Sequence, residues 1–195
     1  MLTLSDSQLN LLGLLACRTV LAGLEGDKSE QIPPTGDATL LALGASFVTL
    51  RKNGALRGCI GSTTAHRPLW ADVEDNALGA AFRDPRFNRV HPHEGPEIVV
   101  EVSVLSPPEK LEFAHAKDLF EQLTHGRDGL IVSHQGNRAT YLPGVWAQFS
   151  SSEQFVRSLC QKAGIPAATP LIQVEIERYA TVHAAGRPLS SGQHD

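Results

Sequence analysis

The stretch GASFVTLRKNGALRGCIG, residues 44–61, contains a complete β-hairpin and the residues best suited to chemistry. Asn53-Gly54 is a strong two-residue turn signal, and the segments on either side of it have the composition of strands. Residues 44–52 and 55–61 are therefore expected to run antiparallel. Alternation then places Arg57, Cys59 and Gly61 on one face of the second strand and residues 56, 58 and 60 on the other.

Cys59 and Arg57 are the leading candidates for catalytic residues. Same-face neighbours on one strand lie about 7 Å apart, and a fixed cation at that range favours a thiolate over a thiol. Gly58 and Gly61 lack side chains, so a ligand or another strand can approach their backbone closely. The alternative is that Cys59 is a small buried strand residue, as most free cysteines are.

Four further residues are candidates for binding: Glu101, Arg83, Arg86 and Tyr141. Glu101 lies opposite the valines of its strand, where it is either a solvated carboxylate or the partner of Arg57. In the second case it would largely cancel the effect of the arginine on the thiol. Arg83 and Arg86 flank the expected end of a helix, where they either form an anion site with Arg57 or simply favour the helix end. Tyr141 closes a second hairpin, either as a pocket wall or as a packing residue.

The rest of the chain mixes helices and strands without strict alternation. The first helix begins at a capping box of Ser5 and Gln8 and ends at Gly26. Further helices are expected near residues 68–84, 116–124 and 155–163, and further strands at 97–105, 130–133, 138–142 and 171–183. This pattern predicts an α+β fold, with a mixed or antiparallel sheet and flanking helices, rather than a doubly wound parallel sheet.

Composition narrows the class of protein. The 195 residues carry 17 basic and 21 acidic side chains, a net charge of −4, and no basic stripe, which argues against nucleic-acid or anionic-membrane binding. Three distant cysteines do not form a disulfide framework, and Cys17 and Cys160 are expected to serve packing. The apolar run 11–17 is too short to span a bilayer, and the N-terminus lacks a basic signal region, so we expect a cytoplasmic protein. Neither paired cysteines nor an HExxH spacing occurs, and no metal or cofactor is expected.

Five segments together resemble the AMMECR domain family, prokaryotic members of which are called protein A of the AmmeMemoRadiSam system. They are LRGCIG at 56–61, AFRDPRF at 81–87, VEVSVLSPPE at 100–109, TYLPGVW at 140–146 and FVRSLCQKAGI at 155–165. The LRGCIG motif is highly specific and the others are moderately so. Residues 25–37 and the tail from Gly186 carry no family signal.

The resemblance implies one α+β domain over residues 1–185, with a larger and a smaller lobe and a cleft between them, followed by a mobile polar tail at 186–195. It also implies two partners, a Memo-type protein similar to non-haem iron extradiol dioxygenases and a radical S-adenosylmethionine enzyme. It marks Arg57, Gly58, Cys59 and Gly61 as functional without supplying a settled activity.

Two functions follow as expectations. In the first, the protein binds or carries a small anionic substrate at an Arg57–Cys59 site, with Arg83 or Arg86 holding the anionic group. In the second, it is a non-enzymatic adaptor that docks the partner enzymes, LRGCIG is a tightly packed strand, and an exposed apolar patch marks the docking surface.

Overall fold

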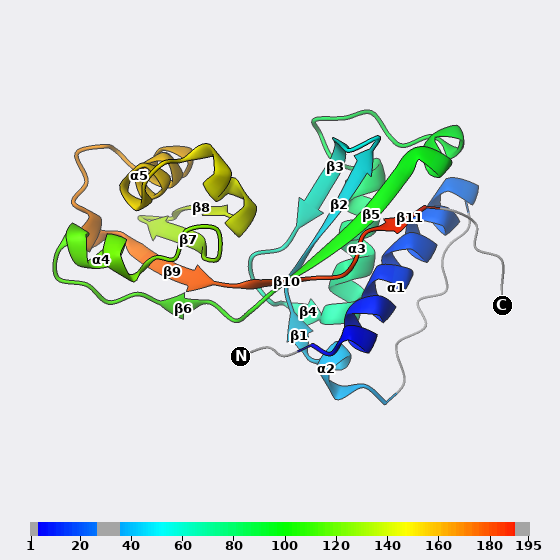
Figure 1. The fold of residues 1–195 in the computed structure, drawn as a ribbon, viewed down its shortest axis with the longest axis horizontal. Coiled ribbons are helices and arrows are strands. Elements are labelled where there is room, and N and C mark those ends of the chain that lie inside the picture. The colour runs from blue at the N-terminus through cyan, green and yellow to red at the C-terminus, as the bar shows by residue number, and fades with distance from the viewer. Residues whose placement is uncertain (1–3, 27–35, 190–195) are drawn as a thin grey trace. The chain divides into compact units, whose positions relative to one another are not determined.

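The computed structural model describes residues 4–26 and 36–189. They form two compact units, each with its own sheet and hydrophobic core. Unit 1 comprises the chain up to Leu105 and from Val182 onward, and unit 2 comprises Ser106–Thr181. Both combine antiparallel strand pairs with flanking helices, which confirms the predicted α+β class (Figure 1). The cleft implied by the resemblance stays a prediction.

The main sheet of unit 1 has the strand order β10–β5–β2–β3, and β11 also pairs with β5. Helices α1 and α3 pack on one face of it around fully buried residues such as Val48, Val73 and Val102 (Figure 1). The elements of this unit are α1 (Asp6–Glu25), α2 (Ala38–Leu41), β1 (Leu43–Gly44), β2 (Ser46–Lys52), β3 (Ala55–Gly61), β4 (Arg67–Pro68), α3 (Leu69–Phe82), the 3-10 helix η1 (Pro92–Glu97), β5 (Ile98–Leu105), β10 (Thr181–His183) and β11 (Arg187–Pro188).

The β2–β3 hairpin forms where the sequence predicts it, but its register contains a bulge. Asn53 and Gly54 both have positive φ, 50° and 81°, which is the requirement of a type I′ turn. Pairing passes from Leu50 opposite Gly58 directly to Arg51 opposite Leu56. Arg57 is therefore the extra residue of a β-bulge, and simple alternation breaks down at this position.

Helix α1 confirms the predicted capping box. The Ser5 side chain accepts from the backbone N–H of Gln8, whose side-chain oxygen accepts from the Ser5 N–H at 2.8 Å. Gly26 ends the helix with a φ of 79°. By length and composition alone, α1 is also the one helix among the described ranges 4–26 and 36–189 that could cross a membrane. Its residues Leu12, Ala16 and Val20 are fully buried in the core of unit 1, as in the core helix of a globular domain.

The C-terminal part of the chain differs from the prediction in two places. Residues 171–183, expected as one strand, form the 3-10 helix η3 (Leu171–Gln173), β9 (Glu175–Tyr179) and β10, because β9 joins the sheet of unit 2 and β10 that of unit 1. Residues 187–189, predicted to belong to a mobile tail, are ordered in the fold, because β11 pairs with residues 99–100 and Leu189 is buried. Residues 190–195, like residues 27–35 of the predicted loop, lie outside the described residues.

Unit 2 has a four-stranded sheet in the order β6–β9–β7–β8. Its core contains a parallel stack of Trp146 and Phe155, whose ring centroids lie 3.8 Å apart, and the Trp146 Nε1 donates to the Asp128 carbonyl at 2.6 Å. The remaining elements are β6 (Glu109–Lys110), α4 (Ala116–Gln122), β7 (Gly129–His134), β8 (Asn137–Tyr141), η2 (Pro143–Gln148) and α5 (Ser152–Lys162). The second predicted hairpin is thus confirmed as β7–β8.

Glycines hold β3 against its neighbours in unit 1. A Cβ atom at Gly58 would lie 2.1 Å from the Ala80 carbonyl oxygen of α3, and one at Gly61 would lie 2.2 Å from the Phe47 ring. The backbone that the sequence analysis expected to admit a ligand or a strand is thus approached by α3 at residue 58 and by a side chain of β2 at residue 61. These two glycines have a packing role.

Replacing Gly58 by alanine should separate β3 from α3. Because the clash involves a helix backbone oxygen, we expect the free energy of unfolding to fall by about 2–3 kcal/mol. Gly144→Ala is the matched control, since a Cβ there meets no atom within 4 Å, and it should change stability by less than about 0.5 kcal/mol. Urea unfolding of both variants measures this, and equal stabilities would show that β3 and α3 are not in tight contact.

Candidate functional site

Arg57 is anchored away from the Cys59 thiol. Its guanidinium donates to both carboxylate oxygens of Glu94 at 3.0 Å and to the carbonyls of Asn88 and Arg89 at 2.9 and 3.2 Å. Lys52 binds the same carboxylate at 3.3 Å, from the sheet face that faces the core. The predicted same-face pair of Arg57 and Cys59 is therefore wrong, because the bulge turns Arg57 toward Glu94.

The Arg57–Glu94 pair is well shielded from water, with 15% and 9% of the two side chains exposed. The bond from Arg57 is the main reason that the pKa of Glu94 is lowered to about 2. The pairing of Arg57 with Glu101, which the sequence left open, does not occur either. Glu101 instead receives the Arg51 Nε on both oxygens, at 3.1 and 3.2 Å.

The backbone of Cys59 is fixed from the outer edge of β3. Since β3 is the last strand of its sheet, the N–H and C=O of Cys59 that face away from β2 need partners other than a strand. The N–H donates to Asp84 at 2.8 Å and the C=O accepts from Arg86 at 2.9 Å. Arg86 also binds Asp84 at 2.7 Å, and this bond is the main reason that the pKa of Asp84 lies well below its usual range.

The thiol of Cys59 lies on the face of the sheet opposite α1 and α3, which we call the outer face. Cys59 stands opposite Thr49, which in turn stands opposite Glu101, so the three form one row across β3, β2 and β5. The Thr49 hydroxyl donates to the sulfur at 3.4 Å. The pKa of Arg86 is raised chiefly by Asp84 and, to a smaller degree, by the Cys59 sulfur. The arginine that binds Cys59 is thus Arg86, through the backbone carbonyl, and not Arg57.

The other two cysteines have the packing role that the sequence predicts. Cys17 and Cys160 are buried in the cores of units 1 and 2. Burial raises the pKa of the Cys17 thiol to about 11 and also raises that of Cys160. Cys59 is half-buried, so it is the most accessible of the three thiols.

Arg83 and Tyr141 have partners elsewhere. Arg83 binds the Asp75 carboxylate at 2.6 Å on the exposed side of α3. Tyr141 belongs to unit 2, where its hydroxyl lies 3.1 Å from the Ser158 hydroxyl and its ring packs against Phe155. Arg83 is thus engaged in an ion pair of its own, and Tyr141 packs against the core of unit 2.

Sequence reasoning missed three residues that define the site: Thr49, Asp84 and Glu94. A signal for Thr49 existed, because strand alternation places it on the same face as Arg51 and Phe47. Asp84 lies inside the AFRDPRF segment, in which only the two arginines are predicted to be functional. Glu94 had no local signal, since its partner Arg57 is 37 residues away.

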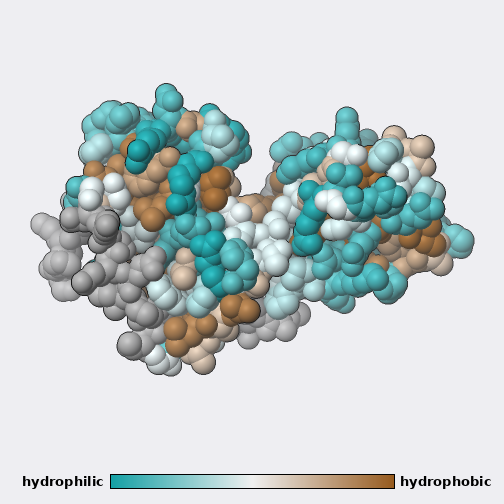
Figure 2. Space-filling view, turned by 180° about the vertical axis from the view of Figure 1, so that it is seen from behind, coloured by the Kyte–Doolittle hydropathy of each residue, from teal (hydrophilic) through white to brown (hydrophobic). Residues whose placement is uncertain are grey.

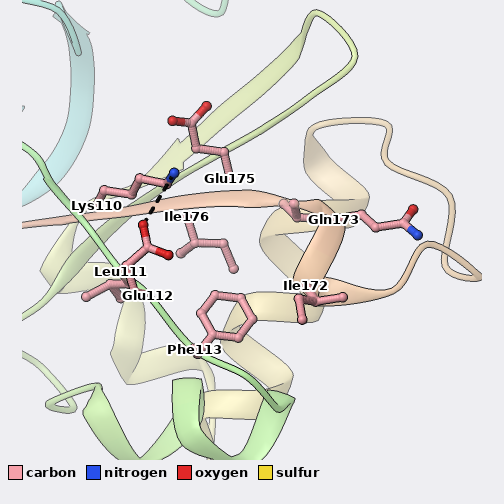
Figure 3. A pocket seen from close by; sticks show the side chains of 9 residues that line it. Lys110, Leu111, Glu112, Phe113, Ile172, Gln173, Glu175 and Ile176 are labelled. Atoms are coloured by element: carbon pink, nitrogen blue, oxygen red, sulfur yellow. Dashed lines mark ion pairs between the residues drawn. The ribbon is translucent and has the colours of Figure 1, made fainter.

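Two surface pockets of about 320 Å³ each lie in unit 2. One borders η3 and β9, where Phe113 and Ile172 lie close together and Lys110 pairs with Glu112 at 3.4 Å (Figure 3). The other surrounds the β7–β8 turn. Neither contains a predicted site residue. Among residues 4–26 and 36–189, there is no cluster of three or more side chains that could bind a metal ion together.

The fold and the site define a two-unit α+β protein built around a hairpin that presents a half-buried thiol on an outer sheet face. The AMMECR1 family model matches residues 14–184, and the chain belongs to this family. A protein of Methanothermobacter thermautotrophicus is 40% identical over 144 residues, which cover 73% of this chain and 75% of that protein. A protein of Methanocella arvoryzae is 37% identical over 174 residues, with 85% and 82% covered. The crystal structure of an uncharacterised protein from Pyrococcus horikoshii matches with a TM-score of 0.81 and 32% identity over 92% of both chains.

Removing the buried carboxylate should reveal how much the Arg57 anchor contributes. Glu94→Gln leaves the Arg57 guanidinium shielded and without a counter-charge, so we expect about 3 kcal/mol lower stability at neutral pH. Because the folded-state pKa of Glu94 is lowered to about 2, its stabilisation is present above the unfolded value of about 4.3 and is lost as pH falls toward 2.

The stability difference between wild type and Glu94→Gln should therefore shrink as pH falls from about 4.5 to about 2. Urea unfolding across that range measures it. Glu112→Gln is the control, since that carboxylate is 82% exposed, and it should change stability little at any pH. A Glu94→Gln difference that stays constant with pH would contradict the ion-pair explanation.

Proposed function

We propose that this protein is the carrier component, protein A, of a three-protein system with a Memo-type protein and a radical S-adenosylmethionine enzyme. It would bind a small substrate or intermediate and hold it covalently at Cys59. The partners rest on the family resemblance. The site rests on one observation, the half-buried Cys59 on the outer face, whose backbone is fixed by Asp84 and Arg86 and whose sulfur accepts from the Thr49 hydroxyl.

Rigid backbone and accessible sulfur are the properties that a carrier thiol needs. Asp84 and Arg86 fix the N–H and C=O of Cys59, so the sulfur is held in place without being enclosed. The Thr49 hydroxyl donates a hydrogen bond to the sulfur at 3.4 Å, and such a donor stabilises negative charge that develops on the sulfur during a reaction. The protein thus supplies a nucleophile with a hydrogen-bond donor already in position.

The simplest reaction open to this thiol is addition to an electrophilic carbonyl. The sulfur electron pair attacks the carbon and forms the S–C bond, the π pair moves to oxygen, and that oxygen takes up the thiol proton. No further reactant is consumed, and reversal releases the intact carbonyl compound to a partner enzyme.

A second candidate function is the adaptor, in which LRGCIG is structural and the partners dock elsewhere. The packing of Gly58 and Gly61 and the anchoring of Arg57 favour it. Its docking surface would be apolar, but on the face shown in Figure 2 hydrophobic residues form small separate groups among hydrophilic ones. The large apolar side chains exposed among the described residues are Leu11, Leu14, Leu41, Leu43, Leu56 and Ile172.

Alkylation of the folded protein by iodoacetamide, followed by peptide mass spectrometry, tests the carrier proposal. We expect Cys59 to react at least about tenfold faster than Cys17 and Cys160, which serve as internal buried controls. Thr49→Val keeps the side-chain shape but removes the hydroxyl, and should slow Cys59 about threefold. Thr49→Ser keeps the donor and should react like the wild type.

If Cys59 is as unreactive as Cys17 and Cys160 in the folded protein, the carrier proposal fails and the adaptor becomes the better interpretation. Equal rates for Thr49→Val and Thr49→Ser would show that the hydroxyl does not influence the reactivity of Cys59, although the thiol could still be the carrier. Circular dichroism of each variant confirms that a changed rate does not come from unfolding.

A further inference from the structure

We infer that the substrate captured at Cys59 carries no net negative charge and is either uncharged or a zwitterion. This inference rests on the carrier proposal and concerns the chemical class of its substrate. It replaces the small anionic ligand that the sequence predicts from its arginines. The reason is the charge balance around the thiol.

Each arginine that the sequence analysis assigned to an anion site already has a carboxylate partner. Arg57 is held by Glu94, Arg83 by Asp75 and Arg86 by Asp84, at 3.0, 2.6 and 2.7 Å. An anionic ligand would have to compete with these built-in carboxylates for every guanidinium. For Arg57 the competition would also break a shielded, doubly hydrogen-bonded pair, which is costly.

The outer face beside Cys59 is likewise electrically balanced. Arg51 lies two residues along β2 from Thr49, and its guanidinium binds Glu101 on β5 at 3.1 Å. Both members of this pair are partly exposed, with 42% and 38% of their side chains accessible. Together they present one positive and one negative group on the same face of the sheet as the thiol, without a net charge. Such a surface suits a ligand that brings one group of each sign or polar uncharged groups.

The neighbouring row on the outer face contains a hydroxyl close to an imidazole. The Ser103 Oγ on β5 lies 2.9 Å from the His183 Nδ1 on β10. Ser103 stands opposite Phe47, one same-face position along from Thr49 and Glu101. These groups add hydrogen-bonding capacity that a polar substrate can use.

Two alkylating reagents of similar size separate the alternatives. Iodoacetamide is uncharged and iodoacetate is an anion, so their rate ratio at one thiol reports the local potential. We expect the ratio of the iodoacetate rate to the iodoacetamide rate at Cys59 to lie within about threefold of the ratio for N-acetylcysteine amide, a free uncharged thiol. A ratio more than about threefold higher would show a net positive site and overturn the inference.

Glu101→Gln provides the matched change. It frees the guanidinium of Arg51, whose backbone lies about 7 Å along β2 from that of Thr49, and should raise the ratio about threefold. Glu25→Gln removes the same charge at the exposed C-terminal end of α1, which packs on the opposite face of the same sheet, and should leave the ratio unchanged. If Glu101→Gln has no effect on the ratio, Glu101 does not balance the site and the inference is wrong.

The two reagents also test this inference about substrate charge separately from the carrier proposal on which it rests. If Cys59 reacts with neither reagent, the carrier proposal is wrong and the inference about its substrate is wrong with it. A Cys59 that reacts well with iodoacetamide but far better with iodoacetate keeps the carrier and restores the anionic substrate.

Discussion

The close contact between Gly58 of β3 and the Ala80 carbonyl of α3 is the constraint on which the site depends. Because this carbonyl occupies the space of a side chain, the C-terminal part of α3 lies directly against the edge strand. The residues that follow the helix are thereby placed beside that edge. Asp84 and Arg86 can then bind the free N–H and C=O of Cys59, a role that a further strand would otherwise take.

The parts of the fold that local signals specify could be predicted from the sequence. Three features depend only on residues close together in the sequence: the α1 capping box, the Asn53-Gly54 turn and the alternation of β5. The bulge at Arg57 could not be predicted in this way. Nothing in LRGCIG distinguishes a regular strand from a bulged one, and a shift of one residue moves a side chain to the opposite face.

The long-range hydrogen bonds and ion pairs could not be predicted from local sequence either. Cys59 and Asp84 are 25 residues apart, and Arg51 and Glu101 are 50 apart. These residues meet because α3 packs against β3 and because β3, β2 and β5 are neighbours in the sheet. No single segment of the sequence encodes this arrangement. The sequence could therefore identify the residue types of the site, namely one thiol, several arginines and a carboxylate, but not which arginine binds Cys59.

Packing and structural bonds explain most residues of the LRGCIG motif but not the thiol. Gly58 and Gly61 admit neighbouring atoms, and Arg57 fixes the chain at residues 88–94. At Cys59 the structural bonds are made by the backbone, and any residue other than proline could supply them. Among the motif's glycines and polar side chains, the Cys59 sulfur alone is left without a structural task, since the Thr49 hydroxyl that contacts it could serve an outer sheet face without it. The functional question for this motif therefore reduces to the chemistry of one thiol.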